Sequence, residues 1–293
     1  MKTATVKSDG LLLVIAAIWG FAFVAQRVGM DHVGPFTYNG VRFALGALTL
    51  APLLLMRTPS SDATPVPMTR RGFICGGGAL GVVLFVAASL QQVALLYTTA
   101  GKAGFITGLY VVVVPILGLF WGQRPSAGTR AGAGLAAAGL YLLSVTESFQ
   151  MESGDGLVLV SALFWSLQVL LVAWLSPRTR PVGLAFYQFS VCAVLSLITA
   201  AIFETFEWAG VVAAAVPIFY GGVLSVGVAY TLQVVAQRDA HPAHASILMS
   251  LEAVFAALGG WMLLGETLSL RGLVGCGMML AGMLLSQLWV VRK

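Results

Sequence analysis

Residues 11–26 read LLLVIAAIWGFAFVAQ, an apolar run without a charged side chain. The hydrocarbon core of a bilayer is about 30 Å thick, and a helix rises about 1.5 Å per residue, so a spanning helix needs about 20 mainly apolar residues. Backbone polar groups have no other partners in lipid, so a run of this kind must be helical there. The run passes into Gln26 and Arg27 without a small-residue cleavage site, which favours a retained first transmembrane helix over a signal peptide.

The rest of the chain repeats this apolar pattern. Hydrophobic residues make up 59% of its 293 positions and charged residues 9%, whereas soluble domains carry about 25% charged residues. The short strands of alternating polarity that are typical of outer-membrane barrels are not visible. We predict an all-α integral membrane protein with ten transmembrane helices, near residues 11–26, 35–56, 72–96, 101–121, 128–145, 156–175, 183–204, 213–236, 243–264 and 271–291.

The charges between these spans predict an orientation. Lys and Arg gather in the loops on the side of the N-terminus, whereas Arg27, Lys102 and Arg271 fall on the opposite side. Because positively charged loops stay in the cytoplasm, we expect both termini there, in a multi-pass protein of a bacterial-type inner (plasma) membrane. The net charge of +5 is then a topology signal, and no nucleic-acid partner is expected.

The two halves of the chain share residues at a nearly constant offset. Asp9 in the first half recurs as Asp155 in the second, and Gln91 recurs as Gln233. Each half holds five predicted spans, an odd number, so the halves would lie in opposite orientations around a central cavity. Inverted repeats are typical of secondary transporters, whose substrate site lies near mid-membrane between the repeats. The predicted organisation is a first repeat over 1–145, a polar joint over 146–155 and a second repeat over 156–293.

Three charged side chains lie within predicted spans or at their edges. An ionisable group at the bilayer centre costs about 2.5–3.5 kcal/mol on insertion scales, so each one needs an explanation. Glu252, halfway along the ninth span, is either a proton or cation site for coupling or gating, or a carboxyl hydrogen-bonded among helices. Arg42 either holds a substrate carboxylate or reaches outward to the interface. Lys102, at the outer mouth, either attracts a carboxylate or anchors the fourth span.

Aromatic and amide side chains recur on single helix faces. Trp19, Phe23 and Gln26, for example, follow the spacing i, i+4, i+7. Amides lack partners in lipid, so such faces should point toward other helices or a wet cavity. A cavity that mixes rings and amides suits a solute with an apolar body, such as a neutral or aromatic amino acid. The predicted substrate-binding residues are Trp19, Tyr38, Gln91, Gln92, Tyr110, Trp165, Tyr230 and Gln233, and Pro115 is a candidate gating bend.

No enzyme signature accompanies these features. The sequence has no P-loop, HExxH or GxSxG motif, so neither catalysis nor ATP-driven pumping is expected, and His241 and His244 are too sparse to predict a metal site. No cofactor is expected. The predicted partners are a small-molecule substrate, the lipid bilayer and protons as a candidate coupling ion. A nucleoside, a vitamin or a cationic drug stays open as the substrate, and a channel or a non-transporting receptor or scaffold stays open as the function.

Four short stretches resemble EamA domains. Residues 18–24 (IWGFAFV) and 41–43 (VRF) are similar to the opening of such a domain, and residues 251–258 (LEAVFAAL) and 264–268 (LGETL) are similar to its closing helices. Two such domains in tandem make the drug/metabolite transporter (DMT) superfamily. The resemblance implies ten helices around a central cavity, alternating access, and export of metabolites, including amino acids in bacterial YddG-type exporters. The family commonly has Glu-Pro, which favours a helix bend, where this chain has Glu252-Ala253.

Overall fold

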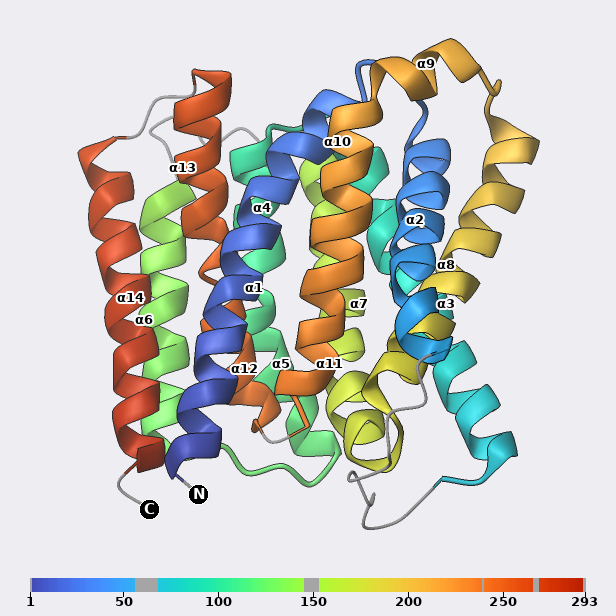
Figure 1. The fold of residues 1–293 in the computed structure, drawn as a ribbon. Coiled ribbons are helices and arrows are strands. Elements are labelled where there is room, and N and C mark those ends of the chain that lie inside the picture. The colour runs from blue at the N-terminus through green and yellow to red at the C-terminus, as the bar shows by residue number, and fades with distance from the viewer. Residues whose placement is uncertain (1, 56–67, 145–152, 239, 266–268, 292–293) are drawn as a thin grey trace.

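A computed structural model of the chain describes residues 2–55, 68–144, 153–238, 240–265 and 269–291. These residues form helices and connecting turns, and no strand occurs among them (Figure 1). Most of the predicted joint over 146–155 lies outside the described ranges, as do residues 266–268 of the LGETL stretch. The prediction of an all-helical chain is confirmed for the residues that are described.

Six helices precede the joint. They are α1 (Lys2–Gly29), α2 (Pro35–Leu55), α3 (Arg70–Ala94), α4 (Ala100–Gly108), α5 (Tyr110–Phe120) and α6 (Ala127–Ser144). The elements after the joint are α7 (Ser153–Leu175), the 3-10 turn η1 (Ser176–Arg178), α8 (Pro181–Phe203), α9 (Trp208–Ala213), α10 (Ala215–Phe219), the π-helical segment η2 (Tyr220–Tyr230), α11 (Thr231–Ala236), α12 (Pro242–Met249), α13 (Glu252–Leu264) and α14 (Leu270–Val291).

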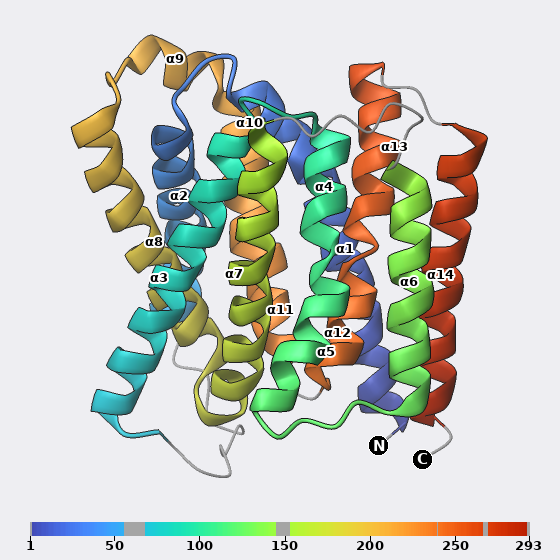
Figure 2. The same ribbon diagram turned by 180° about the vertical axis from the view of Figure 1, so that it is seen from behind.

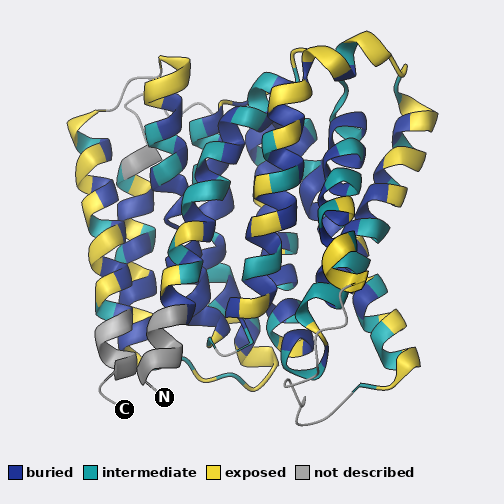
Figure 3. Ribbon diagram, in the orientation of Figure 1, coloured by how far each residue is buried: buried dark blue, intermediate teal, exposed yellow. Residues whose placement is uncertain are grey.

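Several of these helices meet the requirements of membrane spans. Within the described ranges, eight stretches are long and apolar enough to cross a bilayer: Ser8–Gly29, Pro35–Leu55, Arg70–Ala94, Ala100–Phe120, Gly154–Arg178, Pro181–Phe203, Ala215–Ala236 and Pro242–Leu264. A shorter apolar stretch, Leu270–Ser286, follows in α14. Large apolar side chains such as Leu48, Phe203 and Val216 face outward, while buried residues concentrate inside the bundle (Figure 3). Lipid, unlike water, solvates such a surface at no cost.

The helices run between two ends of the bundle (Figure 1). Both chain termini lie at one end, called the terminal end below, and α9 crosses the other, called the α9 end. At one side α6 packs against α14, and at the other α2 packs against α8 (Figures 1 and 2). The contact between α6 and α14 depends on glycine, since a Cβ on Gly132 would come within 2.6 Å of the Gly282 carbonyl oxygen. The central helices α1, α5, α7, α11 and α13 therefore lie between these two flanks.

Two of the long apolar stretches are interrupted near their middle. One divides into α4 and α5 at Leu109, whose backbone N–H donates to Ile106, three residues back, at 3.2 Å. The other divides into α12 and α13 at Ser250 and Leu251, where the N–H of Ala253 donates to Ser250 at 3.1 Å. These bonds span three residues instead of the four of an α-helix, so each stretch tightens into a short turn.

Neither break lies at Pro115, the candidate gating bend. The interruption of the predicted fourth span lies at Leu109, whereas Pro115, the candidate bend, lies inside α5. The second break forms without the proline after the glutamate that the EamA resemblance implies, because a three-residue turn at Ser250 and Leu251 interrupts the helix instead. Leu109 and Leu251 are separated by the same offset as Gln91 and Gln233, so the two breaks occupy equivalent positions in the repeat.

Candidate functional site

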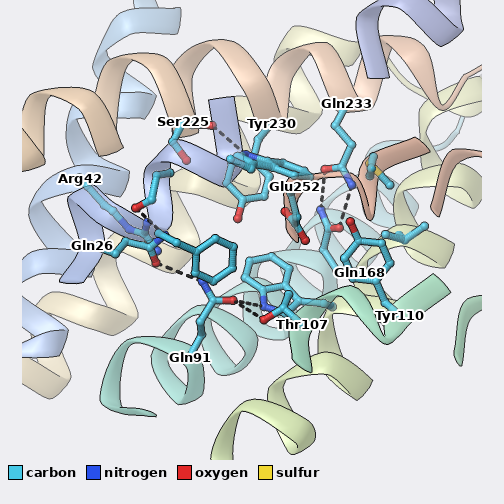
Figure 4. A pocket seen from close by; sticks show the side chains of 16 residues that line it. Gln26, Arg42, Gln91, Thr107, Tyr110, Gln168, Ser225, Tyr230, Gln233 and Glu252 are labelled. Carbon is cyan, nitrogen blue, oxygen red and sulfur yellow. Dashed lines mark hydrogen bonds between the residues drawn. The ribbon is translucent and has the colours of Figure 1, made fainter. Parts of the chain in front are cut away.

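A cavity lies at the centre of the bundle, where the two helix breaks meet (Figure 4). It holds about 30 Å³, room for no more than a few water molecules, so its lining side chains pack closely together in this structure. The predicted residues that line it are Trp19, Arg42, Gln91, Tyr110, Trp165, Tyr230, Gln233 and Glu252. Other lining residues, absent from the predicted set, are Ala22, Phe23, Gln26, Thr107, Gln168, Val169, Ser225 and Met249.

Four predicted residues lie elsewhere. The Tyr38 hydroxyl donates to the Pro217 carbonyl at 2.9 Å, which joins α2 to α10 instead of facing the cavity. The amide of Gln92 donates to the Gln26 carbonyl at 3.3 Å, on the helix face beside the one that carries Gln91. Lys102 lies at the α9 end of α4, and Pro115 lies in α5, five positions beyond Tyr110. Adjacent residues on a helix point in different directions, so Gln91 and Gln92 cannot both face one cavity.

Aromatic rings form one wall of the cavity, and Tyr230 lies at their centre. The ring centroids of Trp19 and Tyr230 are 4.6 Å apart, and the Trp165 ring stacks on Tyr230 at 6.0 Å. The ring centroids of Phe43 and Phe189 each lie 6.1 Å from that of Tyr230. Tyr230 is the last residue of the π-helical segment η2, and π-helical turns often occur at functional sites. Together the rings offer an apolar surface for the body of a ligand.

A first pair of amides closes the cavity toward the α9 end. Gln91 donates to Gln26 Oε1 at 3.1 Å. The Gln91 Oε1 accepts from Trp165 Nε1 at 2.8 Å and from the Thr107 hydroxyl at 3.4 Å. Figure 4 shows these bonds along one side of the cavity. Because Trp165 belongs to α7, this network joins helices from both halves of the chain.

A second pair of amides closes the cavity toward the terminal end. Gln168 in α7 and Gln233 in α11 bond each other through both amide groups, each at 3.1 Å. One turn beyond, Gln237 donates to the Val169 carbonyl at 3.3 Å. This pair is self-contained, since its bonds join two helices of the same half.

A hollow opens at each end of the bundle beyond these amide pairs. Met30, one turn past Gln26, lines the hollow at the α9 end together with Gly34, Thr37 and other residues. Gln237, one turn past Gln233, lines the hollow at the terminal end together with Trp174 and other residues. Each amide pair thus lies between the central cavity and one of the hollows.

Two charged side chains face the cavity. Arg42 is buried, and its Nε donates to Asn39 Oδ1 at 2.9 Å. Glu252 is buried as the first residue of α13, and its Oε1 has no hydrogen-bond partner among the described residues. The hydroxyl of Tyr110, the first residue of α5, is buried beside the Glu252 carboxyl, with which it forms no well-aligned hydrogen bond. Arg42 therefore does not reach outward to the interface, which was the alternative expectation for it.

Ionisable side chains also join helices near each end of the bundle. At the α9 end, Asp155 accepts from the Thr98 hydroxyl at 2.7 Å, and Lys102 Nζ lies 4.0 Å from its other oxygen. At the terminal end, His244 bonds Asp9 at 3.0 Å through Nε2 and Ser286 at 2.9 Å through Nδ1. Among the described residues no group of acids, histidines and cysteines could hold a metal ion.

His241 lies just outside this last contact, before the span that begins at Pro242. Desolvation lowers the pKa of His241 from its usual value, and the nearby His244 lowers it further. Its Nδ1 accepts from the N–H of Ala243 at 3.3 Å, so the ring caps the start of α12. A neutral ring suits this role, because only an unprotonated nitrogen can accept a hydrogen bond.

The predicted substrate-binding residues leave out Gln26 and Gln168, although Gln26 belongs to a face that was expected to point toward other helices or a wet cavity. Gln168 follows Gln26 at the same offset at which Gln233 follows Gln91. The partners in each bonded pair are 65 residues apart. A search for amides at this common offset could have found both pairs.

Comparison with known proteins now identifies the family. The EamA-like transporter family matches residues 6–145 and again residues 152–288. An uncharacterized transporter of Archaeoglobus fulgidus is 31% identical over 260 residues, which cover 88% of this chain and 78% of that protein. The uncharacterized transporter YoaV of Bacillus subtilis is 19% identical over 96% of this chain and 97% of its own length.

Two further similar proteins differ in how much of this chain they match. A probable amino-acid metabolite efflux pump of Salmonella typhimurium is 28% identical over 171 residues, which cover 55% of this chain and 52% of that protein. A protein of known crystal structure superimposes with a TM-score of 0.76 and 19% identity, over 100% of this chain and 99% of that chain. At that identity the superposition supports the fold alone.

Proposed function

The chain belongs to the EamA-like transporter family, with two EamA domains, and we propose that it exports small metabolites, amino acids foremost, by alternating access. The observation that carries this proposal is the central cavity, which combines an aromatic wall, two buried charges and an amide pair on either side. The membership itself makes the chain a membrane transporter and so not an enzyme. The name of the partial relative from Salmonella typhimurium favours amino acids as cargo.

The proposed architecture is ten transmembrane helices in two inverted repeats, 1–145 and 156–293. The repeat is supported by four pairs of positions that share one offset along the chain: Gln26 and Gln168, Gln91 and Gln233, Leu109 and Leu251, and Tyr110 and Glu252. Equivalent amides close opposite ends of the cavity, as inversion requires. The eight spans that meet the length criterion, with α6 and the apolar part of α14 added, make ten.

The two amide pairs are the proposed gates. Alternating access requires that the cavity open to one end while the other stays closed. Gln26 with Gln91 separates the cavity from the hollow at the α9 end, and Gln168 with Gln233 separates it from the hollow at the terminal end. With the termini in the cytoplasm, as the loop charges indicate, opening of the second pair would admit substrate and opening of the first would release it.

Glu252 is the proposed coupling or gating group, with protons as the candidate coupling ion and Pro115 as a further candidate for flexibility within α5. The carboxyl lies at a helix break and faces the cavity, so its protonation would change the charge that a substrate meets. Other small solutes, such as a nucleoside, a vitamin or a cationic drug, are the alternative cargo. The cavity has just one acidic and one basic side chain among its lining residues, which disfavours phosphorylated or multiply charged solutes.

Uptake by proteoliposomes tests the proposal. We expect saturable uptake of labelled neutral and aromatic amino acids that is stimulated by unlabelled amino acid on the opposite side. Trp165→Ala should reduce uptake at least several-fold, since it removes both a wall ring and the bond to Gln91. Trp261→Ala is the matched control, because Trp261 lies on α13 but is 55% exposed on the outer surface.

Several outcomes would count against the proposal. Flat uptake of every amino acid by folded protein would exclude amino-acid transport, and the same panel with nucleosides, vitamins and cationic dyes would then test the alternatives. Uptake that does not saturate would indicate a channel. If a pH gradient drives uptake equally in the wild type and in Glu252→Gln, proton coupling through Glu252 is excluded.

A further inference from the structure

Arg42 is a buried cation whose guanidinium is satisfied only in part by the protein. It is 1% exposed, and its Nε donates to Asn39 Oδ1 at 2.9 Å. Within the described residues its two Nη groups make no hydrogen bond, and no carboxylate oxygen comes within 4.0 Å of its nitrogens. Because a buried charge is strongly destabilising unless it is paired, this guanidinium needs a negative charge beside it.

The protein around Arg42 leaves the central cavity as the side from which a partner can approach. The guanidinium carbon lies 5.4 Å from the centroid of the Tyr38 ring and 5.0 Å from that of Phe43. On the side of η2, a Cβ on Gly221 would lie 3.4 Å from Arg42 Cδ. Ring faces stabilise a cation but do not neutralise it. Arg42 lines the cavity, and Figure 4 shows its side chain reaching that space from α2.

The acidic side chain on the same cavity does not supply the missing charge. Arg42 and Glu252 form no ion pair, and Figure 4 shows them at separate places around the cavity. A row of aromatic rings separates them: Arg42 lies over Phe43, Phe43 approaches Tyr230 at 6.1 Å, and Tyr230 approaches Trp19 at 4.6 Å. An anion next to Arg42 would therefore lie on the opposite side of these rings from Glu252.

The unsatisfied groups and the size of the cavity indicate the kind of partner. Asn39 is fully buried, its Oδ1 accepts from Arg42, and the Nδ2 of the same amide has no partner among the described residues. The Nη groups of Arg42 and the Nδ2 of Asn39 are all hydrogen-bond donors, and an arginine fork binds negatively charged acceptors most strongly. The cavity holds about 30 Å³, which suits an ion not much larger than water and excludes a metabolite.

We propose that the closed cavity binds one small monovalent anion, chloride foremost, on the Arg42 guanidinium, with the Asn39 amide as a second donor. The anion neutralises the buried cation, for which the described residues supply no carboxylate. A divalent anion would leave an uncompensated negative charge in its place. The inference goes beyond the proposed function, because it concerns an ion in the closed cavity and holds for any cargo. A cargo carboxylate has the same chemistry, but it can replace the anion only after the cavity opens.

Thermal unfolding of the purified protein in detergent tests this site. Potassium chloride and bromide are compared with potassium gluconate at equal ionic strength, because gluconate is too large for the cavity. At about tenfold above Kd, a bound anion should raise Tm by about 2–5 °C over the value in gluconate. Arg42→Gln should abolish this difference, and Arg42→Lys, which keeps the charge, should retain part of it. Arg271→Gln is the matched control, because Arg271 lies over the Tyr141 ring outside the cavity.

Equal Tm values of the wild-type protein in the three salts would overturn the proposal, and so would an undiminished chloride effect in Arg42→Gln. If Arg42→Gln does not fold, crystals of the wild-type protein grown in bromide decide the question. An anomalous bromide peak beside the Arg42 nitrogens would support the proposal, and a map without a peak there would overturn it.

Added leucine distinguishes the two sources of the anion. If leucine weakens the effect of chloride and leucinamide does not, the cargo carboxylate binds the same group as chloride. If neither changes it, chloride alone is the ligand of Arg42. Because these measurements need no transport, a chloride effect with flat liposome uptake would refute amino-acid transport alone. Saturable uptake without any chloride effect on Tm would refute the anion site alone.

Discussion

The two amide pairs that flank the cavity have the same residues and the same spacing but different partners. Gln26 with Gln91 and Gln168 with Gln233 are each 65 residues apart. The second pair is satisfied by two reciprocal bonds. In the first pair Gln91 divides its bonds among Gln26, Thr107 and Trp165. The two equivalent pairs thus differ in what they join. Separation of the first pair disturbs helices of both halves of the chain, and separation of the second disturbs helices of one half.

A similar inequality holds for the ionisable contacts at the two ends. Lys102 and His244 are separated by the same offset as Gln91 and Gln233, and each approaches an aspartate near the start of another helix, Asp155 or Asp9. His244 is buried and bonds two partners, whereas the Lys102 side chain is 32% exposed. The two contacts therefore occupy equivalent positions in the repeat but differ in strength.

The largest loss of stability is expected when one amide in each pair is replaced. Gln91→Leu removes three hydrogen bonds, and interhelical bonds in membranes are worth about 0.6 kcal/mol each, so we expect a loss of about 2 kcal/mol in the free energy of unfolding. Gln233→Leu removes two bonds and should cost about 1 kcal/mol. Reversible unfolding in mixed detergent and SDS measures both. Equal losses, or a larger loss for Gln233→Leu, would contradict the inequality.

Replacing both amides of a pair tests the same difference in a second way. When both members of a pair become apolar, no buried donor or acceptor is left behind within it. Gln168→Leu with Gln233→Leu should therefore recover part of the loss caused by Gln233→Leu alone. Gln26→Leu with Gln91→Leu should not recover to the same extent, because Trp165 Nε1 still lacks its acceptor.

Much of the fold could be predicted from the sequence because lipid leaves few choices. Apolar runs such as 11–26 must be helical, and the EamA resemblance on residues 18–24 and 251–258 is confirmed by the family match. The helix breaks were harder to predict from the sequence. The chain has no proline at Ala253, and Pro115 drew attention away from Leu109, because a three-residue turn leaves no local composition signal.

The site was predictable where a residue type is unusual in lipid. Arg42 and Glu252 stand out in apolar runs, and both line the cavity. Tyr38 and Gln92 have equally suitable chemistry, but their direction depends on the rotation of α2 and α3 about their axes, which packing against α10 and α1 sets. Helical periodicity groups residues on a face without saying which face looks inward.

The ionisable contacts give a second, smaller test. His244→Ala removes bonds to Asp9 and Ser286, one of them to a carboxylate, and should cost about 1–2 kcal/mol of unfolding free energy. Lys102→Ala should cost less than about 0.5 kcal/mol, since a partly exposed ion pair at 4.0 Å contributes little. The same unfolding assay measures both. A loss for Lys102→Ala as large as that for His244→Ala would show that the two ends are equally tied.

A last test concerns the one bond that links the first amide pair to the second half of the chain. Trp165→Phe keeps a ring next to Tyr230 but removes the Nε1–H that donates to Gln91, so we expect a loss of about 0.6 kcal/mol from that bond. The lost ring volume adds to the effect of the single variant, but it cancels in a double-mutant cycle with Gln91→Leu. Trp19→Phe is the control, because its Nε1 donates at 3.3 Å to the backbone oxygen of Ser225, which Gln91→Leu leaves in place. A coupling energy with Gln91 that is no larger for Trp165 than for Trp19 would mean that the bond to Trp165 contributes nothing to the first pair. Any difference in stability between the two pairs would then have to come from the bond to Thr107.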